Sequence, residues 1–278
     1  MRLAHDYVVA SGDGPSRAER DRNPEEFAET MGYREGRFRT REDLLEHART
    51  RWVAELHDVL GELLSRERSI LSLGSGYCEH EVPFALAGYR IVATDIVEDA
   101  LADAGRLFPE LTVRRFDVLA PDLQERFDDV LVAGLDFALD DDELRKALLN
   151  LRSVLEPGGR VIFVLRYHDN LATRLIDGLM RPAIAHATRV RARLSGRRLA
   201  VLRREHGFRR RRSEVRRLAA ETGYRVGRVR HAAFALELER IDLHRRLPAL
   251  YRLAQRVDRR LAVFNSATVF ELLTENPR

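Results

Sequence analysis

The chain has 278 residues, of which 45% are hydrophobic and 33% are charged, an ordinary composition for a globular protein with a sizeable core. No apolar run reaches the ~20 residues that a membrane-spanning helix needs, and the first ten residues lack the long apolar stretch of a secretory signal, so we expect a cytoplasmic protein. The net charge is +4, and the single cysteine, Cys78, excludes an intrachain disulfide and a multi-cysteine metal site, so no metal is expected.

Irregular and helical sequence precedes the first predicted strand. Residues 11–24 are rich in Gly, Pro, Ser, Asp and Arg, which is typical of an irregular segment. A helix is predicted from Thr40, which can cap it together with Asp43, and an apolar stripe of helical period continues it for about 20 residues. We expect residues 1–67 to form a cap in front of a main domain that covers residues 68–278.

Five short apolar runs then alternate with helical segments. The predicted strands are 70–73, 90–95, 111–118, 129–133 and 160–165, and the predicted helices between them are 79–87, 97–107 and 141–155. The strands are apolar on consecutive positions, which suits strands that are covered on both faces. Strands separated by helices of this length require crossover connections, so the pattern predicts a mostly parallel sheet with helices on both sides.

The remaining sequence contains a basic insertion and two more strands. Residues 170–212 are predicted to be a mainly helical insertion after the fifth strand. A helix at 213–222 that ends at Gly223, a strand at 224–234, a helical piece at 236–261 and a final strand at 266–273 complete the prediction. Fifteen arginines and only three acidic residues lie between 172 and 217, so the positive charge of the chain is concentrated there.

A glycine turn follows the first predicted strand. Glycines in Gly74-Ser75-Gly76 let a ligand approach the backbone closely, and the next helix presents free N–H groups. Asp95 ends the second strand about 20 residues later, where a carboxylate can accept hydrogen bonds from ribose hydroxyls. The glycine turn alone suits a nucleotide, a dinucleotide or plain tight packing, so further motifs are needed to decide.

Three further motifs follow in order along the chain. Arg-Phe-Asp-Val ends the third strand at Asp117, Phe-Asp-Asp-Val-Leu-Val-Ala-Gly-Leu covers the fourth, and Leu-Glu-Pro-Gly-Gly precedes the fifth. The series, over about Ser69 to Arg166, resembles the ordered motifs of class I S-adenosylmethionine-dependent methyltransferases. The resemblance implies a Rossmann-like seven-stranded α/β fold and S-adenosyl-L-methionine as the cofactor.

The resemblance also implies a cofactor site. Gly74 and Gly76 would approach the methionine part, Asp95 would bind the ribose, and Gly134 with Leu135 would line the methyl-transfer face. Asp117 would face the adenine amino group, with a backbone contact from the next residue. The predicted cofactor-binding residues are Ser72, Gly74, Ser75, Gly76, Asp95, Ile96, Asp117, Val118, Gly134 and Leu135.

Two positions depart from the family pattern. The family commonly has an acidic residue where this chain has Ser72, and often a third glycine where it has Cys78. A serine hydroxyl can still hydrogen-bond the cofactor amino group, directly or through water, but more weakly than a carboxylate. A non-catalytic binding protein that kept the fold is therefore one alternative function.

The acceptor is predicted to be a small or lipid-like molecule that is methylated at oxygen. Positioning supplies much of the rate of methyl transfer, but an oxygen acceptor usually also needs a base. His168, just after the fifth strand, and Asp136, just after the fourth, are the candidate catalytic residues. Ordinary structural roles at the surface or at a strand end would also explain both of them.

The basic insertion allows three interpretations. We favour the interpretation that the insertion forms a lid over the acceptor. Residues 171–212 could also contact an anionic membrane surface or RNA phosphates. No motif of base-specific nucleic-acid methylation follows the fourth strand, which disfavours a nucleic-acid partner. An RNA methyltransferase and a nicotinamide dehydrogenase remain alternatives, although the Pro-Gly-Gly turn and Asp117 argue against the dehydrogenase. The sequence does not specify the oligomeric state.

Overall fold

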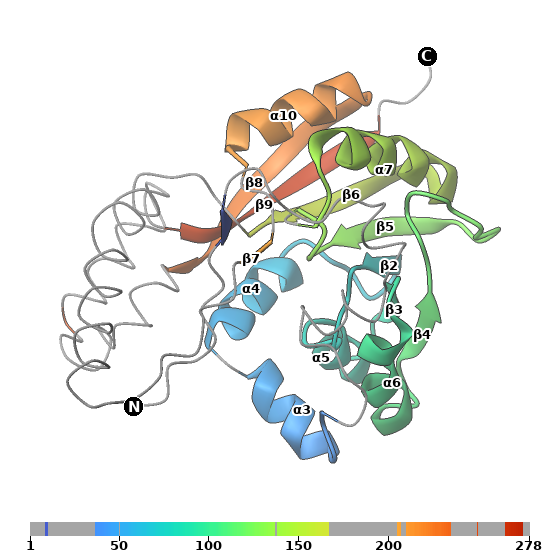
Figure 1. The fold of residues 1–278 in the computed structure, drawn as a ribbon, viewed down its shortest axis with the longest axis vertical. Helices are drawn as coiled ribbons and strands as arrows, with labels where there is room; N and C mark the ends of the chain where they lie inside the picture. The colour runs from blue at the N-terminus through green and yellow to red at the C-terminus, as the bar shows by residue number, and fades with distance from the viewer. Residues whose placement is uncertain are drawn as a thin grey trace, which may run out of the picture.

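A seven-stranded sheet with helices on both sides forms the centre of the molecule (Figure 1). The computed structural model describes residues 9–10, 37–49, 51–136, 138–166, 205–206, 210–234, 249 and 265–274. The predicted irregular segment 11–24, most of the insertion at 170–212 and nearly all of the predicted helix at 236–261 lie outside the described residues. Within the described ranges, no helix has the length and apolar character needed to cross a bilayer.

The strands lie in the order β4–β3–β2–β5–β6–β9–β8. They are β2 (Ser69–Leu73), β3 (Arg90–Asp95), β4 (Thr112–Arg115), β5 (Phe127–Val132), β6 (Leu155–Leu165), β8 (Tyr224–Phe234) and β9 (Asn265–Thr274). The first five pair in parallel, and β9 pairs antiparallel with both β6 and β8. A separate two-stranded parallel sheet pairs β1 (Val9–Ala10) with β7 (Glu205–His206). The prediction of a Rossmann-like, mostly parallel seven-stranded sheet is confirmed.

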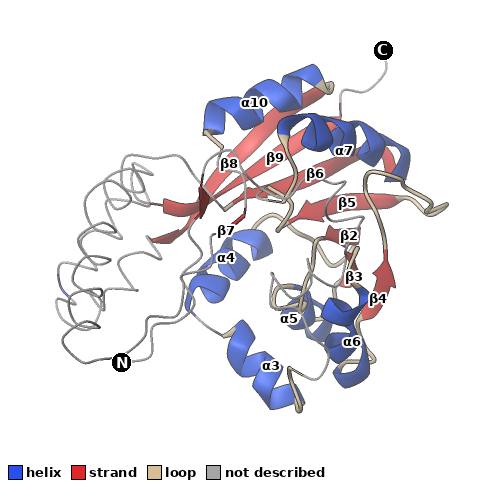
Figure 2. Ribbon diagram, viewed as in Figure 1, coloured by secondary structure: helices blue, strands red, loops and turns tan. Residues whose placement is uncertain are grey.

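Helices cover both faces of the sheet, as Figure 2 shows. They are α3 (Arg41–Ala48), α4 (Arg51–Gly61), α5 (Glu81–Leu86), α6 (Glu98–Leu107), α7 (Asp141–Val154) and α10 (Arg212–Glu221). Successive side chains of a strand point to opposite faces. Ile70 of β2 therefore packs in the core with α4, α5 and α6, whereas Leu71 packs in the core with α7 and α10. Burial on both faces explains why the strand sequences are apolar at consecutive positions.

The single long helix that the sequence predicts from Thr40 is two helices in the structure, α3 and α4. Thr40 caps α3 as expected, since its hydroxyl accepts a hydrogen bond from the Asp43 backbone N–H at 3.1 Å and the Asp43 carboxylate accepts one from the Thr40 N–H at 3.0 Å. The predicted apolar stripe, however, is shared by α3 and α4. Because α3 packs against α5 while α4 packs against β8 and β9, one straight helix could not make both contacts.

Two strand boundaries also differ from the prediction. The third parallel strand, β4, is shorter, because Asp117 already turns the chain by accepting a hydrogen bond from the Leu119 N–H at 2.8 Å. The fifth, β6, is longer and includes the Pro-Gly-Gly segment, with a register shift between Phe127 and Asp129 of its neighbour β5. A local turn therefore ends β4 early, whereas the pairing of Leu155 with Phe127 on β5 lengthens β6.

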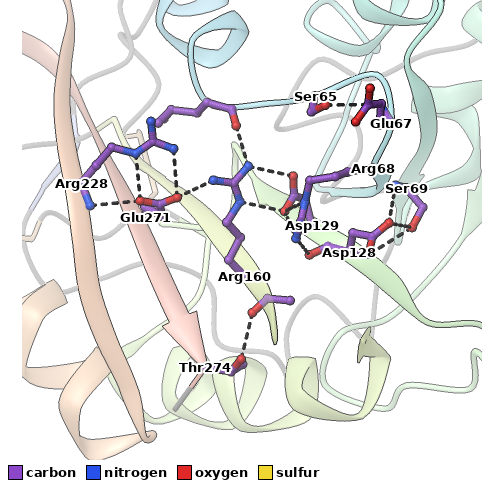
Figure 3. Close-up of polar contacts among 12 residues, drawn as sticks. Ser65, Glu67, Arg68, Ser69, Asp128, Asp129, Arg160, Arg228, Glu271 and Thr274 are labelled. Carbon is purple, nitrogen blue, oxygen red and sulfur yellow. Dashed lines mark hydrogen bonds and ion pairs between the residues drawn. The ribbon is translucent and has the colours of Figure 1, made fainter. Parts of the chain in front are cut away.

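A buried ion pair joins β5 to β6 toward the amino ends of the parallel strands (Figure 3). The Asp129 side chain is fully buried. Its carboxylate accepts hydrogen bonds from Arg160 Nε at 2.8 Å and from Arg68 Nε, in the segment before β2, at 2.9 Å. Arg160 also donates to the Leu63 carbonyl oxygen at 2.6 Å, which ties the end of the N-terminal helical region to the sheet.

The same arginine extends the contact into the antiparallel part of the sheet (Figure 3). Arg160 bonds to Glu271 of β9, and Arg228 of β8 donates to the same carboxylate from Nε at 3.1 Å. Burial opposes ionisation of Glu271, but hydrogen bonds from the two arginines lower the pKa of this carboxyl to about 2. We call Arg68, Asp129, Arg160, Arg228 and Glu271 the strand clasp.

We expect the Asp129→Ala variant to be less stable than the wild type by about 3–5 kcal/mol, because the largely buried side chain of Arg160, 13% exposed, would lose its main partner. Urea denaturation of both proteins would measure the difference. Glu110→Ala is the matched control, since Glu110 pairs with Arg41 at the surface, where an ion pair contributes little. Similar losses in the two variants would contradict a special role of the strand clasp.

Candidate functional site

The predicted glycine turn follows β2 at the point where the strand order reverses. From β2 the sheet continues through β3 on one side and β5 on the other, and ligands of such sheets bind at the carboxyl ends of these strands. Gly74 and Gly76 have φ angles of +66° and +51°, which a residue with a side chain rarely adopts. Hydrogen bonds from the Ser75 N–H to the Thr94 carbonyl oxygen (3.0 Å) and from Thr94 Oγ1 to the Ser72 carbonyl oxygen (2.7 Å) fix the turn to β3.

Asp95, at the end of β3, lies directly at this turn. Its buried carboxylate accepts hydrogen bonds from the Gly76 N–H at 2.9 Å and from the Val97 N–H at 3.0 Å. Burial raises the pKa of Asp95, and these backbone donors oppose that shift. The adjacent Ile96 is 39% exposed, so an apolar side chain stands open to solvent next to a buried acid. The structure thus brings together the glycine turn and the acid that the sequence analysis paired.

The loop after β5 packs against the same turn. A Cβ atom on Gly134 would stand 2.8 Å from the carbonyl oxygen of Gly74, and a Cβ atom on Gly74 would stand 3.0 Å from the Leu135 side chain. These two loops are therefore in direct contact, and side chains at either glycine would separate them. Gly134 and Leu135 therefore lie against the glycine turn, and their role in lining a methyl-transfer face stays a prediction.

The segment after β4 joins the site beside Asp95. The Phe116 N–H donates to the Asp95 carbonyl oxygen at 3.1 Å, which places the next residue, Asp117, near the end of β3. Asp117 is half-buried, and Val118 is buried with its carbonyl oxygen accepting a hydrogen bond from Asn150 Nδ2 at 2.8 Å. The predicted adenine-side residues therefore lie on the neighbouring loop and not on the glycine turn itself.

The structure describes one of the two predicted catalytic residues, Asp136. Asp136 is fully buried, and its Oδ2 atom accepts a hydrogen bond from the Arg166 N–H at 2.7 Å. Arg210, itself buried, donates to the carbonyl oxygens of Asp136 and of Leu139. Asp136 thus connects the loop after β5 to the end of β6. His168 lies outside the described residues.

A buried acid that the sequence did not predict lies at this site. Glu81, in the first turn of α5, is fully buried, and its Oε1 atom accepts a hydrogen bond from Ser72 Oγ at 2.6 Å. Its Oε2 atom has no hydrogen-bond partner among the described residues. Burial raises the pKa of Glu81 to about 7, and the hydroxyls of Ser72 and Ser75 oppose the shift. An acid in the first turn of a helix is common, so the sequence had no signal for this burial.

A second polar cluster neighbours Glu81. His47 Nε2 lies 2.7 Å from Glu79 Oε2, and Arg166 Nη2 lies 2.9 Å from His80 Nε2 and 3.4 Å from Glu79 Oε1. Burial opposes ionisation of Glu79, but His47, His80 and Arg166 lower its pKa to about 2. Burial and the nearby Arg166 charge lower the pKa of His80 to about 3. At neutral pH the cluster therefore contains an ionised Glu79 and an uncharged His80.

Comparisons with known proteins find a family resemblance over the first five strands of the sheet. Residues 70–159 match a family model that is described as a methyltransferase domain. A search of curated protein sequences finds no match. The matched range runs from β2 to the Pro-Gly-Gly segment of β6, so it contains the glycine turn, Asp95 and Gly134.

Several solved methyltransferase structures share the fold. Magnesium protoporphyrin IX methyltransferase from Synechocystis PCC 6803 is 13% identical, with a TM-score of 0.52 over 93% of this chain and 99% of its own. A glycopeptide N-methyltransferase is 16% identical, with a TM-score of 0.53 over 86% of this chain and 100% of its own. A methyltransferase from Methanosarcina mazei is 14% identical, with a TM-score of 0.52 over 79% and 98%. At these identities the likeness shows a common fold.

We expect the Gly134→Ala variant to be less stable by about 1–3 kcal/mol, because the new methyl group would press on the Gly74 carbonyl oxygen and push the two loops apart. Thermal and urea unfolding would measure the loss. Gly61→Ala, at the end of α4, is the control, since a Cβ atom there meets nothing within 4 Å. Unchanged stability of Gly134→Ala would mean that the loops do not depend on this contact.

Proposed function

We propose that this class I methyltransferase transfers the methyl group of S-adenosylmethionine to an oxygen atom of a small-molecule or lipid-like acceptor. The observation that carries the proposal is the buried Asp95 carboxylate, hydrogen-bonded to Gly76 of the turn after β2. An acid at the end of the second parallel strand can accept hydrogen bonds from both ribose hydroxyls, while a glycine turn leaves the backbone accessible to the rest of the ligand.

The residues at the carboxyl ends of the strands fit this cofactor chemically. S-adenosylmethionine carries a positive ammonium group and a positive sulfonium group. Three acids from different segments, Glu81, Asp95 and Asp117, lie around the glycine turn or next to it. The exposed side chain of Ile96 offers an apolar surface to the adenine ring. Gly134 has no side chain, so it can lie directly against the glycine turn. Ser72, Ser75, Val118 and Leu135 complete the set of residues to which we assign cofactor contacts.

The bound cofactor would supply an electrophilic methyl group, so the protein's own task is to orient the acceptor and to remove its proton. We assign the first task to the loop after β5, which Asp136 and Arg210 hold in place. Asp136 is fully buried and its Oδ2 atom is already bonded to the Arg166 N–H, so we assign it the role of holding this loop. His168 is therefore the preferred candidate for the base.

The class of acceptor follows from the fold relatives by analogy. Their names specify a magnesium porphyrin and a glycopeptide as acceptors, which are small molecules and not nucleic acids. We extend this class to the present chain. Contact of the basic residues 171–212 with an anionic membrane surface is part of the proposal for a lipid-like acceptor, whereas contact with RNA is the competing alternative.

We expect the Asp95→Ala variant to bind S-adenosylmethionine and S-adenosylhomocysteine roughly 10- to 100-fold more weakly than the wild type, as the loss of two hydrogen bonds would produce. Isothermal titration of the folded proteins would measure this. Asp58→Ala is the matched control, because Asp58 is an exposed acid on α4, and it should bind as the wild type does. A folded wild-type protein that binds neither ligand would refute the cofactor assignment.

We expect labelled methyl groups from S-adenosylmethionine to appear on a small hydroxyl- or carboxyl-containing molecule in a panel that also includes lipids and total RNA. The same assay at several salt concentrations would expose binding through phosphate contacts, which weakens steeply with salt. Label in RNA alone would favour the RNA methyltransferase. Cofactor binding without labelling of any acceptor, across a broad panel, would favour the non-catalytic protein.

A further inference from the structure

Glu81 is a buried acid that has no cation beside it in the described part of the chain. It is fully buried, and among the described residues it forms no ion pair. Ser72 Oγ donates to Oε1 at 2.6 Å, while Oε2 has no partner in the described part of the chain. Because an isolated buried charge is costly, such a group either carries a proton or receives a positive ligand.

The groups that surround Glu81 do not compensate its charge. Ser72 on β2 and Ser75 in the glycine turn contribute neutral hydroxyls, and Glu79 adds a further negative charge. Burial and the charges of Glu81, Asp95 and Glu79 together raise the pKa of the Cys78 thiol well above its usual value, so that thiol stays uncharged.

The neighbouring acids, in contrast, have their own partners. Glu79 lies against His47 and Arg166, and Asp95 accepts two backbone N–H groups. The uncharged His80 bonds to the same arginine. Glu81 is therefore the acid of this group that is left to bind a cation from outside the protein.

We propose that Glu81 binds the ammonium group of the cofactor's methionine part, and so replaces, from helix α5, the acid that β2 lacks at Ser72. The inference rests on the proposed function. An ammonium group can donate a hydrogen bond to the Oε2 atom, whereas a sulfonium group has no N–H or O–H to donate. Ser72 keeps a role in this arrangement, since its hydroxyl holds the Oε1 atom of the Glu81 carboxylate.

This arrangement links cofactor binding to a proton. Burial raises the pKa of Glu81 to about 7, so in the free protein much of this carboxyl is protonated below neutral pH. An ammonium group beside it favours the ionised form and lowers that pKa, so binding releases a proton. Affinity therefore rises with pH up to about 7, by at most about tenfold per pH unit.

The raised pKa of Glu81 also makes the stability of the free protein depend on pH, in the opposite direction from the affinity. The stabilisation from a raised carboxyl pKa is fully present below the ordinary value of 4.5 and is lost as the pH rises through about 7. Above about pH 8 the ligand's own α-amino group begins to lose its proton, so the informative range is pH 5.5 to 7.5.

The test is isothermal titration of the full-length protein with two ligands, in two buffers that differ in protonation enthalpy. One ligand is S-adenosylhomocysteine, and the other is 5′-methylthioadenosine, which shares the adenosine part but has no amino-acid part. The wild type is expected to release a proton and to show rising affinity from pH 5.5 to 7.5 with the first ligand but not with the second. This measurement needs no variant, so it does not depend on how a substitution folds.

The Glu81→Gln variant is expected to bind S-adenosylhomocysteine about 10- to 100-fold more weakly, without proton release, and to bind 5′-methylthioadenosine as the wild type does. Glu98→Gln is the matched control, because Glu98 occupies the first turn of α6 but is exposed. Equal losses for both ligands, or no loss for either, would overturn the assignment of Glu81.

Failure of the proposed function would look different. In that case the folded wild type would bind neither S-adenosylhomocysteine nor S-adenosylmethionine at any pH, and the assignment of Glu81 would fall with it. If the wild type binds both but shows no proton release and no pH dependence, the methyltransferase proposal stands and the assignment of Glu81 is wrong.

Discussion

The buried pair of Asp129 and Arg160 determines how the two halves of the sheet fit together. A buried ion pair stabilises a fold only when its remaining donors and acceptors are satisfied. Here the Asp129 carboxylate takes donors from Arg68 and Arg160, and Arg160 gives its other N–H groups to Leu63 and Glu271. Because these contacts link β5, β6 and β9, they favour one register, and that register sets where the carboxyl ends of the strands lie.

The opposite ends of the parallel strands are organised differently. There the loops after β2 and β5 touch through Gly74 and Gly134, and backbone N–H groups bind the Asp95 carboxylate. Among the described residues, Glu81 has a hydroxyl partner at Oε1 and no hydrogen-bond partner at the buried Oε2 atom. The charged groups of the strand clasp thus bond to one another at the amino ends of the parallel strands, whereas the buried acids near the glycine turn bond to backbone N–H groups and hydroxyls.

Arg210 links this site to the region of the basic insertion. It precedes α10, and its buried guanidinium group donates to the carbonyl oxygens of Asp136 and Leu139 and to the Asp141 carboxylate at 2.9 Å. A buried arginine with several acceptors holds its contacts in one geometry. The loop after β5 is therefore held by two arginines, Arg166 just after β6 and Arg210 just before α10.

Local patterns in the sequence determined the sheet, the capped helix at Thr40, the glycine turn, and the pairing of that turn with Asp95, since strand periodicity, capping and turn chemistry act over a few residues. The burial of Glu81 beside Ser72, the partners of Asp129 and the break between α3 and α4 were decided by the tertiary structure alone. The physical reason is that burial and ion pairing depend on which distant segments meet: Asp129 and Arg160 are 31 residues apart, and Arg160 and Glu271 are 111 apart. A glutamate in a first helical turn has the same local sequence signal whether its side chain faces water or the protein interior.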